Sequence, residues 1–339
     1  MTRNLFLGAD LTPAIEAADF EDFIEKNGGI LREVMLTDFP RRARALAAEI
    51  RNERPDLVGL QEVALWRTAT PANLGGVSEP AATDVRVDFL KELMERINQR
   101  KRLYKVAVVQ NEFDFEAPAD ENDVDGDGEL PDPFDDAELN GRLTMRDAIL
   151  VRRSDDVRFK RPRSGNFENL LELSVASVPV TVERGWTRIE AKVGDSPWFS
   201  FTNTHLEAFD DETETPSIRQ LQATEVGGPD GYAESRRPTV LVGDLNSDDN
   251  TVAPNDQKAY NALLDFGWVS RSTDENSCCV SDLFTSPPSE FDHHIDHVMT
   301  NTPRKVRRAA GGKATGLAKV NGIYPSDHGG MLANLRIRK

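Results

Sequence analysis

Cysteine is nearly absent from this sequence: its 339 residues include only two, the neighbours Cys278 and Cys279. Small scaffolds that depend on several disulfides are therefore excluded. Consecutive Cα atoms lie about 3.8 Å apart, whereas those of bridged cysteines usually lie roughly 4.4–6.8 Å apart, so a bridge between neighbours would be strained. We therefore favour two free or partly buried thiols, which leaves the redox compartment open.

Long apolar runs and an excess of basic residues are missing as well. No segment approaches the roughly 18 consecutive apolar residues that a membrane-spanning helix needs. The chain has 41 Lys+Arg against 58 Asp+Glu, and its formal net charge of -17 repels the phosphate backbone of a nucleic acid unless a local basic patch compensates. A transmembrane helix is excluded, and nucleic acid is disfavoured as a partner.

The residues that are present suit a large folded domain. Hydrophobic residues make up 38% of the chain and include 16 Phe, enough for a sizeable core, and the 29% of charged residues is typical of globular proteins. Only the segment at about 112–141 differs in composition, being acidic and rich in Pro, Asp and Gly. We expect a single domain over residues 1–339 with an acidic surface insertion at about 112–141.

Hydrophobic periodicity predicts helices that alternate with strands. Apolar residues recur at helical spacing in 37–53, 87–100 and 214–226. Strand-like apolar runs occur at 56–62, 104–109, 148–151, 178–182, 187–193, 198–204, 240–244, 295–298 and 332–337. Because several neighbouring strands are close enough in the chain to form hairpins, we expect an α/β protein with mixed sheets.

Polar residues gather where these apolar strands end. The clusters are Asn4, Gln61-Glu62, Asn203-Thr204-His205, Gly243-Asp244-Leu245-Asn246, Asp296 and Ser326-Asp327-His328. Strand ends hold side chains rigidly in convergent positions while the adjoining loops admit a ligand. Each cluster alone is compatible with a capping or solvated side chain, but six of them in one chain indicate a shared functional site.

This ordered set, with its Gly-Asp-Leu-Asn and Ser-Asp-His signatures, resembles the endonuclease/exonuclease/phosphatase superfamily from about Asn4 to Ile337. The superfamily includes deoxyribonuclease I, AP endonucleases, neutral sphingomyelinases and inositol polyphosphate 5-phosphatases. The resemblance implies a four-layer sandwich, in which two mixed β-sheets lie face to face and helices flank them. It also implies metal-dependent hydrolysis of phosphoesters, without fixing the substrate.

The same resemblance implies a site for a catalytic divalent ion. Phosphoester hydrolysis requires a water in line with the leaving oxygen and compensation of the charge on the phosphoryl oxygens. Hard oxygen ligands suit Mg²⁺ or Mn²⁺, which keeps coordination positions open for water and substrate. The implied ligands are Asn4 and Glu62, with Asp327 near the ion or holding a second one.

The remaining residues are assigned to catalysis by the resemblance. Asp244 matches the residue that orients and deprotonates the attacking water, and Asn246 helps to fix this water and the phosphate. His328 matches the residue that contacts the scissile phosphate, and Asp296 pairs with its ring and fixes its tautomer. His205 would donate to a phosphoryl oxygen. We expect a single in-line displacement without a covalent intermediate.

The acidic insertion suggests a separate calcium site. Asp123, Asp125 and Asp127, with Gly128 in the sixth place, fit the first half of an EF-hand-type loop. The twelfth place holds Phe134 in place of a bidentate Glu, so a solvated acidic loop is the alternative. We expect a structural Ca²⁺ at 123–136.

These features favour a metal-dependent phosphodiesterase or phosphatase. A nuclease acting on DNA or RNA is the alternative, and it needs a basic face that the net charge does not supply on average. A catalytically silent binding module is less compatible, because such a protein is expected to lose some of the metal-binding and water-activating residues, and all of them are present. The leaving group and the oligomeric state stay open.

The N-terminus bears on localisation. It carries no apolar signal segment, and strand-like residues begin almost at once, at Leu5. Such a start is typical of a mature protein whose leader was removed and replaced by Met1, and calcium loops of low affinity also suit the outside of the cell. The localisation is unknown, and an extracellular or periplasmic protein is the expectation if a leader was removed.

Overall fold

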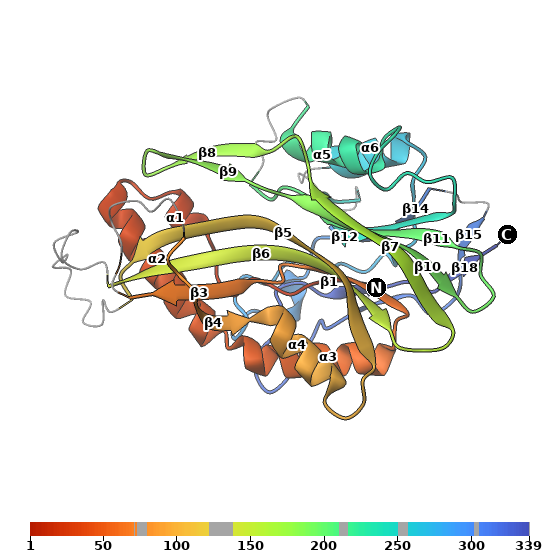
Figure 1. Ribbon diagram of the computed structural model, residues 1–339, viewed down its shortest axis with the longest axis horizontal. Helices are drawn as coiled ribbons and strands as arrows, with labels where there is room; N and C mark the ends of the chain where they lie inside the picture. The colour runs from red at the N-terminus through yellow and green to blue at the C-terminus, as the bar shows by residue number, and fades with distance from the viewer. Residues whose placement is uncertain are drawn as a thin grey trace.

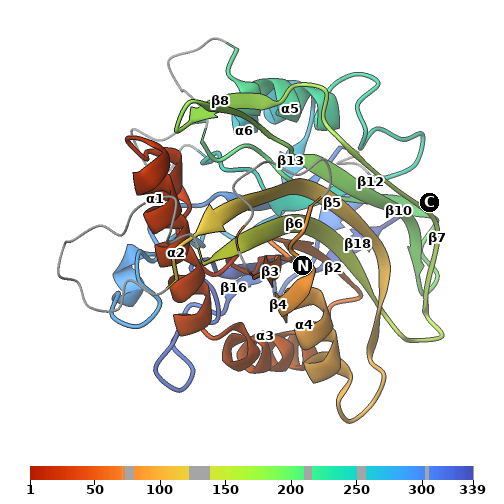
Figure 2. The same ribbon diagram turned by 60° about the vertical axis from the view of Figure 1, so that its left-hand side comes forward.

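The computed structural model describes residues 1–70, 72, 80–121, 138–209, 216–249, 257–301 and 305–338. Two mixed β-sheets lie face to face at the centre of the molecule, and helices cover their outer faces (Figures 1 and 2). This arrangement confirms the predicted α/β sandwich. No helix in these ranges is long and apolar enough to span a membrane.

The first sheet carries the N-terminal half of the site. Parallel pairing of β1 with β2 places their carboxyl ends at the same edge, while β2 and β6 run antiparallel. The strand order is β16 (Lys313–Thr315), β17 (Gly330–Leu332), β1 (Thr2–Asn4), β2 (Leu57–Gln61), β6 (Leu139–Arg152), β3 (Leu65–Ala69) and β4 (Asp84–Asp88), and β5 (Tyr104–Ala119) pairs with β6.

The second sheet carries the C-terminal half. Parallel pairing of β11 with β12 sets His205 opposite Asp244, and antiparallel pairing of β12 with β14 sets Asp244 opposite Asp296. The strand order is β13 (Val269–Ser270), β14 (Asp296–Thr300), β12 (Thr239–Asp244), β11 (Phe199–His205), β10 (Gly185–Val193) and β7 (Val157–Asn166). Two short ribbons pair β8 (Leu171–Val175) with β9 (Val178–Val182) and β15 (Val306–Arg308) with β18 (Leu335–Ile337).

The helices form the outer layers of the sandwich. Buried apolar residues of α2 (Phe20–Leu36), α3 (Phe39–Glu53) and α4 (Phe89–Asn98) pack on the first sheet. Those of α5 (Ile218–Gly227) and α6 (Lys258–Asp265) pack on the second sheet, and the short α1 (Thr12–Ile15) precedes α2. In α3 the apolar residues recur at helical spacing, and the Asp38 side chain caps the first turn by accepting from the backbone N–H of Arg41.

Alternation along the strands fills the space between the two sheets. Val240 and Val242 of β12 belong to the apolar layer between the sheets, whereas Leu241 faces the layer shared with α5 and α6. Strand β6 divides in the same way, since Ile149 lies between the sheets and Leu150 lies toward the helices of the first sheet. Successive residues of these strands face two different layers, and both layers are apolar. The strands therefore appear in the sequence as continuous apolar runs.

The two sheets approach each other closely at Gly59, in the middle of β2. A Cβ atom at this position would meet the side-chain oxygen of Asn203 and would lie 2.6 Å from Cγ2 of Val242 on the opposite sheet. Both neighbours are buried, so neither has room to move away. Glycine is therefore required here by the close approach of the two sheets.

The acidic insertion is shorter than the sequence suggested. Strand β5 continues to Ala119 and β6 begins at Leu139, so both ends of the predicted range of 112–141 belong to the sheet, and Ala117, Ala119 and Leu139 are buried. Composition misled here because one face of β5 is acidic: Asp114 pairs with Arg142 of β6. The predicted calcium ligands Asp123, Asp125 and Asp127 lie outside the described residues.

The two cysteines are paired. Cys278 and Cys279 form a disulfide between neighbouring residues, so the expectation of free thiols is wrong. That expectation rested on the Cα separations usual for disulfides, and this pair, with its Cα atoms 3.0 Å apart, lies outside that range.

Two Gly→Ala exchanges should have opposite effects on stability. Gly59→Ala forces a methyl group into the contact between the sheets and should lower the free energy of unfolding by about 1–3 kcal/mol. Gly29→Ala, in the middle of α2 with only Arg32 within 4 Å of the new Cβ, should raise it by roughly 0.5–1 kcal/mol. Urea denaturation measures both, and equal midpoints for Gly59→Ala and the wild type would contradict the close approach.

Candidate active site

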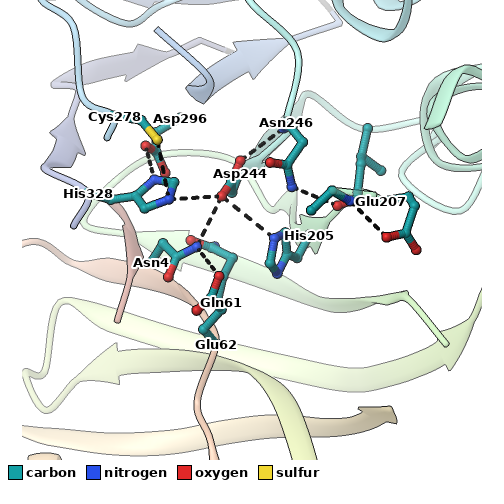
Figure 3. Close-up of polar contacts among 12 residues, drawn as sticks. Asn4, Gln61, Glu62, His205, Glu207, Asp244, Asn246, Cys278, Asp296 and His328 are labelled. Carbon is teal, nitrogen blue, oxygen red and sulfur yellow. Dashed lines mark hydrogen bonds and ion pairs between the residues drawn. The ribbon is translucent and has the colours of Figure 1, made fainter. Parts of the chain in front are cut away.

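The two sheets bring their polar strand ends to one place. Asn4 ends β1 and Glu62 follows β2 in the first sheet, while His205 ends β11 and Asp244 ends β12 in the second. Figure 3 shows these side chains pointing toward one another, with His328 reaching Asp244 from the opposite side. The structure thus brings together the residues that the sequence singled out at widely separated positions.

Asn4 connects the two sheets through its side-chain amide. Its Nδ2 donates to Oε1 of Glu62 at 2.9 Å and to Oδ2 of Asp244 at 3.0 Å. Its Oδ1 accepts from the backbone N–H of Phe6 at 2.9 Å, which fixes the orientation of the amide. Asn4 is fully buried, so these contacts are protected from competition with water.

Glu62 and Asp327 provide carboxylates at the same cleft. The cleft has a volume of about 610 Å³, and both residues line it and remain partly exposed there. Glu62 has a φ of 53°, a conformation that non-glycine residues rarely adopt, and its Oε2 accepts from the backbone N–H of Leu7 at 2.6 Å. Burial and the nearby Glu62 raise the pKa of Asp327 to about 6.

These carboxylates fit a hard divalent cation. Two anionic groups that repel each other at a partly solvated cleft are oxygen donors of the kind that Mg²⁺ or Mn²⁺ prefers. The predicted third ligand, Asn4, differs from this expectation, because it turns Nδ2 toward Glu62 while its Oδ1 accepts from Phe6. Two other groups in the described chain have their donor atoms within 4.8 Å of one another: Asp244, Asp296 and His328, and Cys278, Cys279 and His328. Both are less suitable, because both need His328, which already binds Asp296 through Nδ1 and has a pKa raised well above 6.5.

His328 is held as an imidazolium. Its Nδ1 donates to Oδ2 of Asp296 at 2.9 Å, and that oxygen also accepts from Oγ of Ser277 at 2.7 Å. Burial lowers the pKa of His328, but the carboxylates of Asp296, Asp327 and Asp244 outweigh burial and raise the pKa well above 6.5. A doubly protonated ring leaves Nε2–H as a donor, and this atom lies 3.6 Å from Oδ2 of Asp244.

The two cysteines lie against the same ring atom. Sγ of Cys278 is 3.5 Å and Sγ of Cys279 is 3.7 Å from Nε2 of His328. They therefore form part of the wall beside the imidazolium, a contact that the sequence did not predict.

Asp244 lies at the centre of the site. Burial raises its pKa to about 7, although the positive charge of His328 opposes this shift. The backbone N–H of Asn246 donates to Oδ1 at 2.9 Å, and Nδ2 of Asn4 donates to Oδ2 at 3.0 Å. Asn246 itself is tied to the end of β11, because its Nδ2 donates to the carbonyl of Leu206 at 2.9 Å.

His205 has the opposite protonation state to His328. Its Nδ1 lies 3.2 Å from Nη1 of the buried Arg184. A guanidinium can only donate hydrogen bonds, so Nδ1 accepts and the single ring proton is on Nε2. Burial, then the charges of Arg184 and His328, lower the pKa of His205 well below 6.5. Its Nε2–H lies 3.6 Å from Oδ2 of Asp244.

Behind His205 lies a buried charged group that sequence reasoning missed. Nη2 of Arg184 lies 3.5 Å from Oε1 of Glu207, which also accepts from the backbone N–H groups of Ala208 and Phe209. Burial raises the pKa of Glu112 to about 8 and that of Asp147 well above its usual value. Glu207, two residues after His205, follows the strand-end pattern and could have been found.

A second buried arginine holds the loops around the cleft. Arg42 of α3 donates to the carbonyls of Leu5 at 2.7 Å, Phe6 at 3.1 Å and Pro325 at 3.1 Å. These carbonyls belong to the segments that follow Asn4 and precede Asp327. Arg42 therefore positions both segments, although its own side chain lies outside the catalytic cluster.

Comparison with known proteins identifies the fold and the family. The family described as "Endonuclease/Exonuclease/phosphatase family" matches residues 34–328. No curated protein matches the sequence significantly.

Solved structures resemble the whole chain at low sequence identity. An endonuclease/exonuclease/phosphatase family protein from Leptotrichia buccalis is 14% identical, with a TM-score of 0.52 over 94% of this chain and 97% of that one. A family protein from Beutenbergia cavernae is 19% identical, with a TM-score of 0.53 over 89% and 66%. TDP2 of D. rerio, complexed with a single-strand DNA product, is 17% identical, with a TM-score of 0.50 over 87% and 91%. These likenesses show the shared fold.

The protonation state of His205 can be measured directly. Nitrogen-15 NMR of labelled protein between pH 6 and 8 should show His205 as a neutral ring with its proton on Nε2, because Arg184 occupies Nδ1. His328 in the same spectrum should be doubly protonated and serves as the internal control. In Arg184→Met the pKa of His205 should rise, since a neighbouring cation is lost. A doubly protonated His205 in the wild type would contradict the assignment.

Proposed function

The chain belongs to the endonuclease/exonuclease/phosphatase family, and we propose that it hydrolyses small phosphodiesters or phosphomonoesters with Mg²⁺ or Mn²⁺ as the catalytic ion. One observation carries the proposal. Oδ2 of Asp244 lies 3.6 Å from Nε2 of His205 and 3.6 Å from Nε2 of His328, so one proton acceptor stands between two proton donors. This geometry suits a water that attacks a phosphoryl group whose oxygens need donors.

Glu62 and Asp327 would hold the divalent ion, while Asn4 would orient Glu62 through Nδ2. When bound, the ion supplies charge compensation to a phosphoryl oxygen and keeps open positions for water. Support for this placement comes from the cleft, where Glu62 and burial together raise the pKa of Asp327. Asn4 keeps Glu62 and Asp244 in a fixed relation because it donates to both.

Asp244 acts as the general base. A carboxyl group with a pKa of about 7 is ionised in a large fraction of molecules at neutral pH and accepts a proton more readily than an ordinary carboxylate. Asn4 and Asn246 each donate to one of its oxygens, which leaves the remaining lone pairs for the attacking water.

The two histidines act as donors to the phosphoryl oxygens. His328 brings a positive charge, maintained by Asp296, whereas His205 brings a neutral Nε2–H, maintained by Arg184. Charge that develops on the phosphoryl oxygens during in-line attack is stabilised by these donors, which are already oriented before the substrate arrives. No side chain needs to form a covalent intermediate.

A small substrate is favoured over a nucleic acid. The cleft is lined by the carboxylates of Asp10, Glu33 and Asp282 in addition to Glu62 and Asp327, while Arg184 is the one Lys or Arg among its described lining residues. With a net charge of -17, this surface repels a long polyanion. A nuclease is the second candidate, and the experiment below separates the two.

The substrate class is tested by hydrolysis of bis-p-nitrophenyl phosphate, p-nitrophenyl phosphate and plasmid DNA with Mg²⁺, Mn²⁺ or EDTA. We expect EDTA-sensitive cleavage of at least one nitrophenyl ester and no nicking of DNA. In Asp244→Asn and His328→Gln the rate should fall by about 10²–10⁴-fold, whereas Asp265→Asn, on the exposed surface of α6, should keep it. Nicking of DNA without ester cleavage would favour the nuclease, and wild-type rates in Asp244→Asn would refute the assigned base.

Metal binding should depend on pH through Asp327. Its pKa of about 6 means that it binds a proton as the pH falls below this value, and the proton competes with the ion. The affinity for Mn²⁺, measured by calorimetry, should be about tenfold lower at pH 5 than at pH 7. Asp327→Asn should bind Mn²⁺ more weakly and lose this dependence. Glu33→Gln, at the same cleft, should behave like the wild type; a metal affinity unchanged in Asp327→Asn would exclude Asp327 as a ligand.

A further inference from the structure

An apolar hollow adjoins the cleft that contains Glu62 and Asp327. It has a volume of about 100 Å³ and is enclosed by α1, α2, the strands β5 and β6, and the ribbon of β8 and β9. Figures 1 and 2 show this ribbon lying across β5 and β6, with α1 and α2 at the same end of the molecule. We call this hollow the side chamber; its walls include Phe23, Leu31, Phe115, Leu143, Leu173 and Val180.

The side chamber and the cleft share four lining residues, Leu11, Met145, Arg184 and Phe209. Arg184 is the residue whose Nη1 lies 3.2 Å from the ring of His205. A residue that lines the side chamber, Arg184, thus contacts His205, which we assign as a donor to the phosphoryl oxygens. Phe209, with 36% of its surface exposed, stands at this junction.

The walls of the side chamber suit an apolar occupant. Apart from Arg184, the described lining residues that carry a polar side-chain atom are Asn27 and Trp66. Nδ2 of Asn27 already donates to the carbonyl of Pro118 at 3.2 Å, and Nε1 of Trp66 donates to the carbonyl of Leu7 at 2.8 Å. The two terminal nitrogens of Arg184 contact His205 and Glu207. A water molecule in the chamber would find few partners, so an alkyl group displaces it at little cost.

We propose that the side chamber binds a short alkyl group on the substrate, so that the preferred substrates are phosphodiesters with an alkyl ester of about four carbons. This inference rests on the proposed function. The chain length follows from volume: a cavity of about 150 Å³ holds the six carbons of benzene, and two thirds of that volume holds about four. We assign the occupant to the substrate, because the chamber adjoins the cleft at Arg184, which contacts His205.

The test uses a series of p-nitrophenyl alkyl phosphates with methyl, ethyl, butyl and octyl groups. Release of p-nitrophenol with Mn²⁺ gives kcat/KM for each ester. The value should rise by about fourfold for each added methylene up to butyl, because each buried methylene contributes about 0.8 kcal/mol, and should not rise further for octyl. Equal values for methyl and butyl esters would show that the chamber is only a packing void.

A larger or a smaller side chain at position 173 should reduce or increase the volume of the side chamber. This residue lies on β8 and is only half-buried, so its replacement should not prevent folding. Leu173→Trp should abolish the preference for butyl over methyl. Leu173→Ala should move the optimum to a longer chain. Leu264→Trp and Leu264→Ala, at an exposed leucine of α6, are the matched controls and should leave the series unchanged.

Measurements of binding test this inference even if the proposed function is wrong. If no ester is hydrolysed, the proposed function fails, but calorimetry with butylphosphonate and methylphosphonate in the presence of Mn²⁺ still tests the chamber. Tighter binding of butylphosphonate in the wild type but not in Leu173→Trp supports the inference. Equal binding of the two phosphonates overturns it.

Discussion

The site depends on a single buried amide that joins the two sheets. Asn4 ends a strand of the first sheet and donates to Glu62 on that sheet and to Asp244 on the other. Asn4 thereby links Glu62 to Asp244, although the two carboxylates come from different layers of the sandwich. Gly59, two strand positions before Gln61, allows this because it lets the two sheets approach closely. The close packing of the two sheets therefore also determines the geometry of the site.

Two histidines in one site are held in opposite protonation states by their neighbours. His328 binds a carboxylate through Nδ1 and is an imidazolium, while His205 meets a guanidinium at the same ring atom and is neutral. Both present Nε2–H toward Asp244 at the same distance of 3.6 Å. The site therefore offers one charged and one neutral donor to a phosphoryl group. The side chains behind the ring, and not the histidines themselves, determine this difference.

The strands and the polar residues at their ends follow from local patterns in the sequence, whereas the face-to-face sandwich was implied by the family resemblance. The buried strand before Asp244 is a continuous apolar run, and the polar residue at its end is visible without any knowledge of pairing. Arg184 was not predicted, because its role arises from the pairing of β10 with β11, which sets Gly185 opposite His205. Glu112 was assigned to the surface insertion because the segment around it is acidic. In the structure Glu112 is nevertheless buried. Patterns along the chain do not reveal such contacts between strands.

The central claim is that Glu62 and Asp327 hold the catalytic ion beside Asp244. The most direct measurement is X-ray diffraction from crystals soaked in Mn²⁺, with the ion located by its anomalous signal. We expect one strong peak in the cleft, within bonding distance of carboxylate oxygens of Glu62 and Asp327. A peak between Asp244, Asp296 and His328, with none beside Glu62, would contradict it.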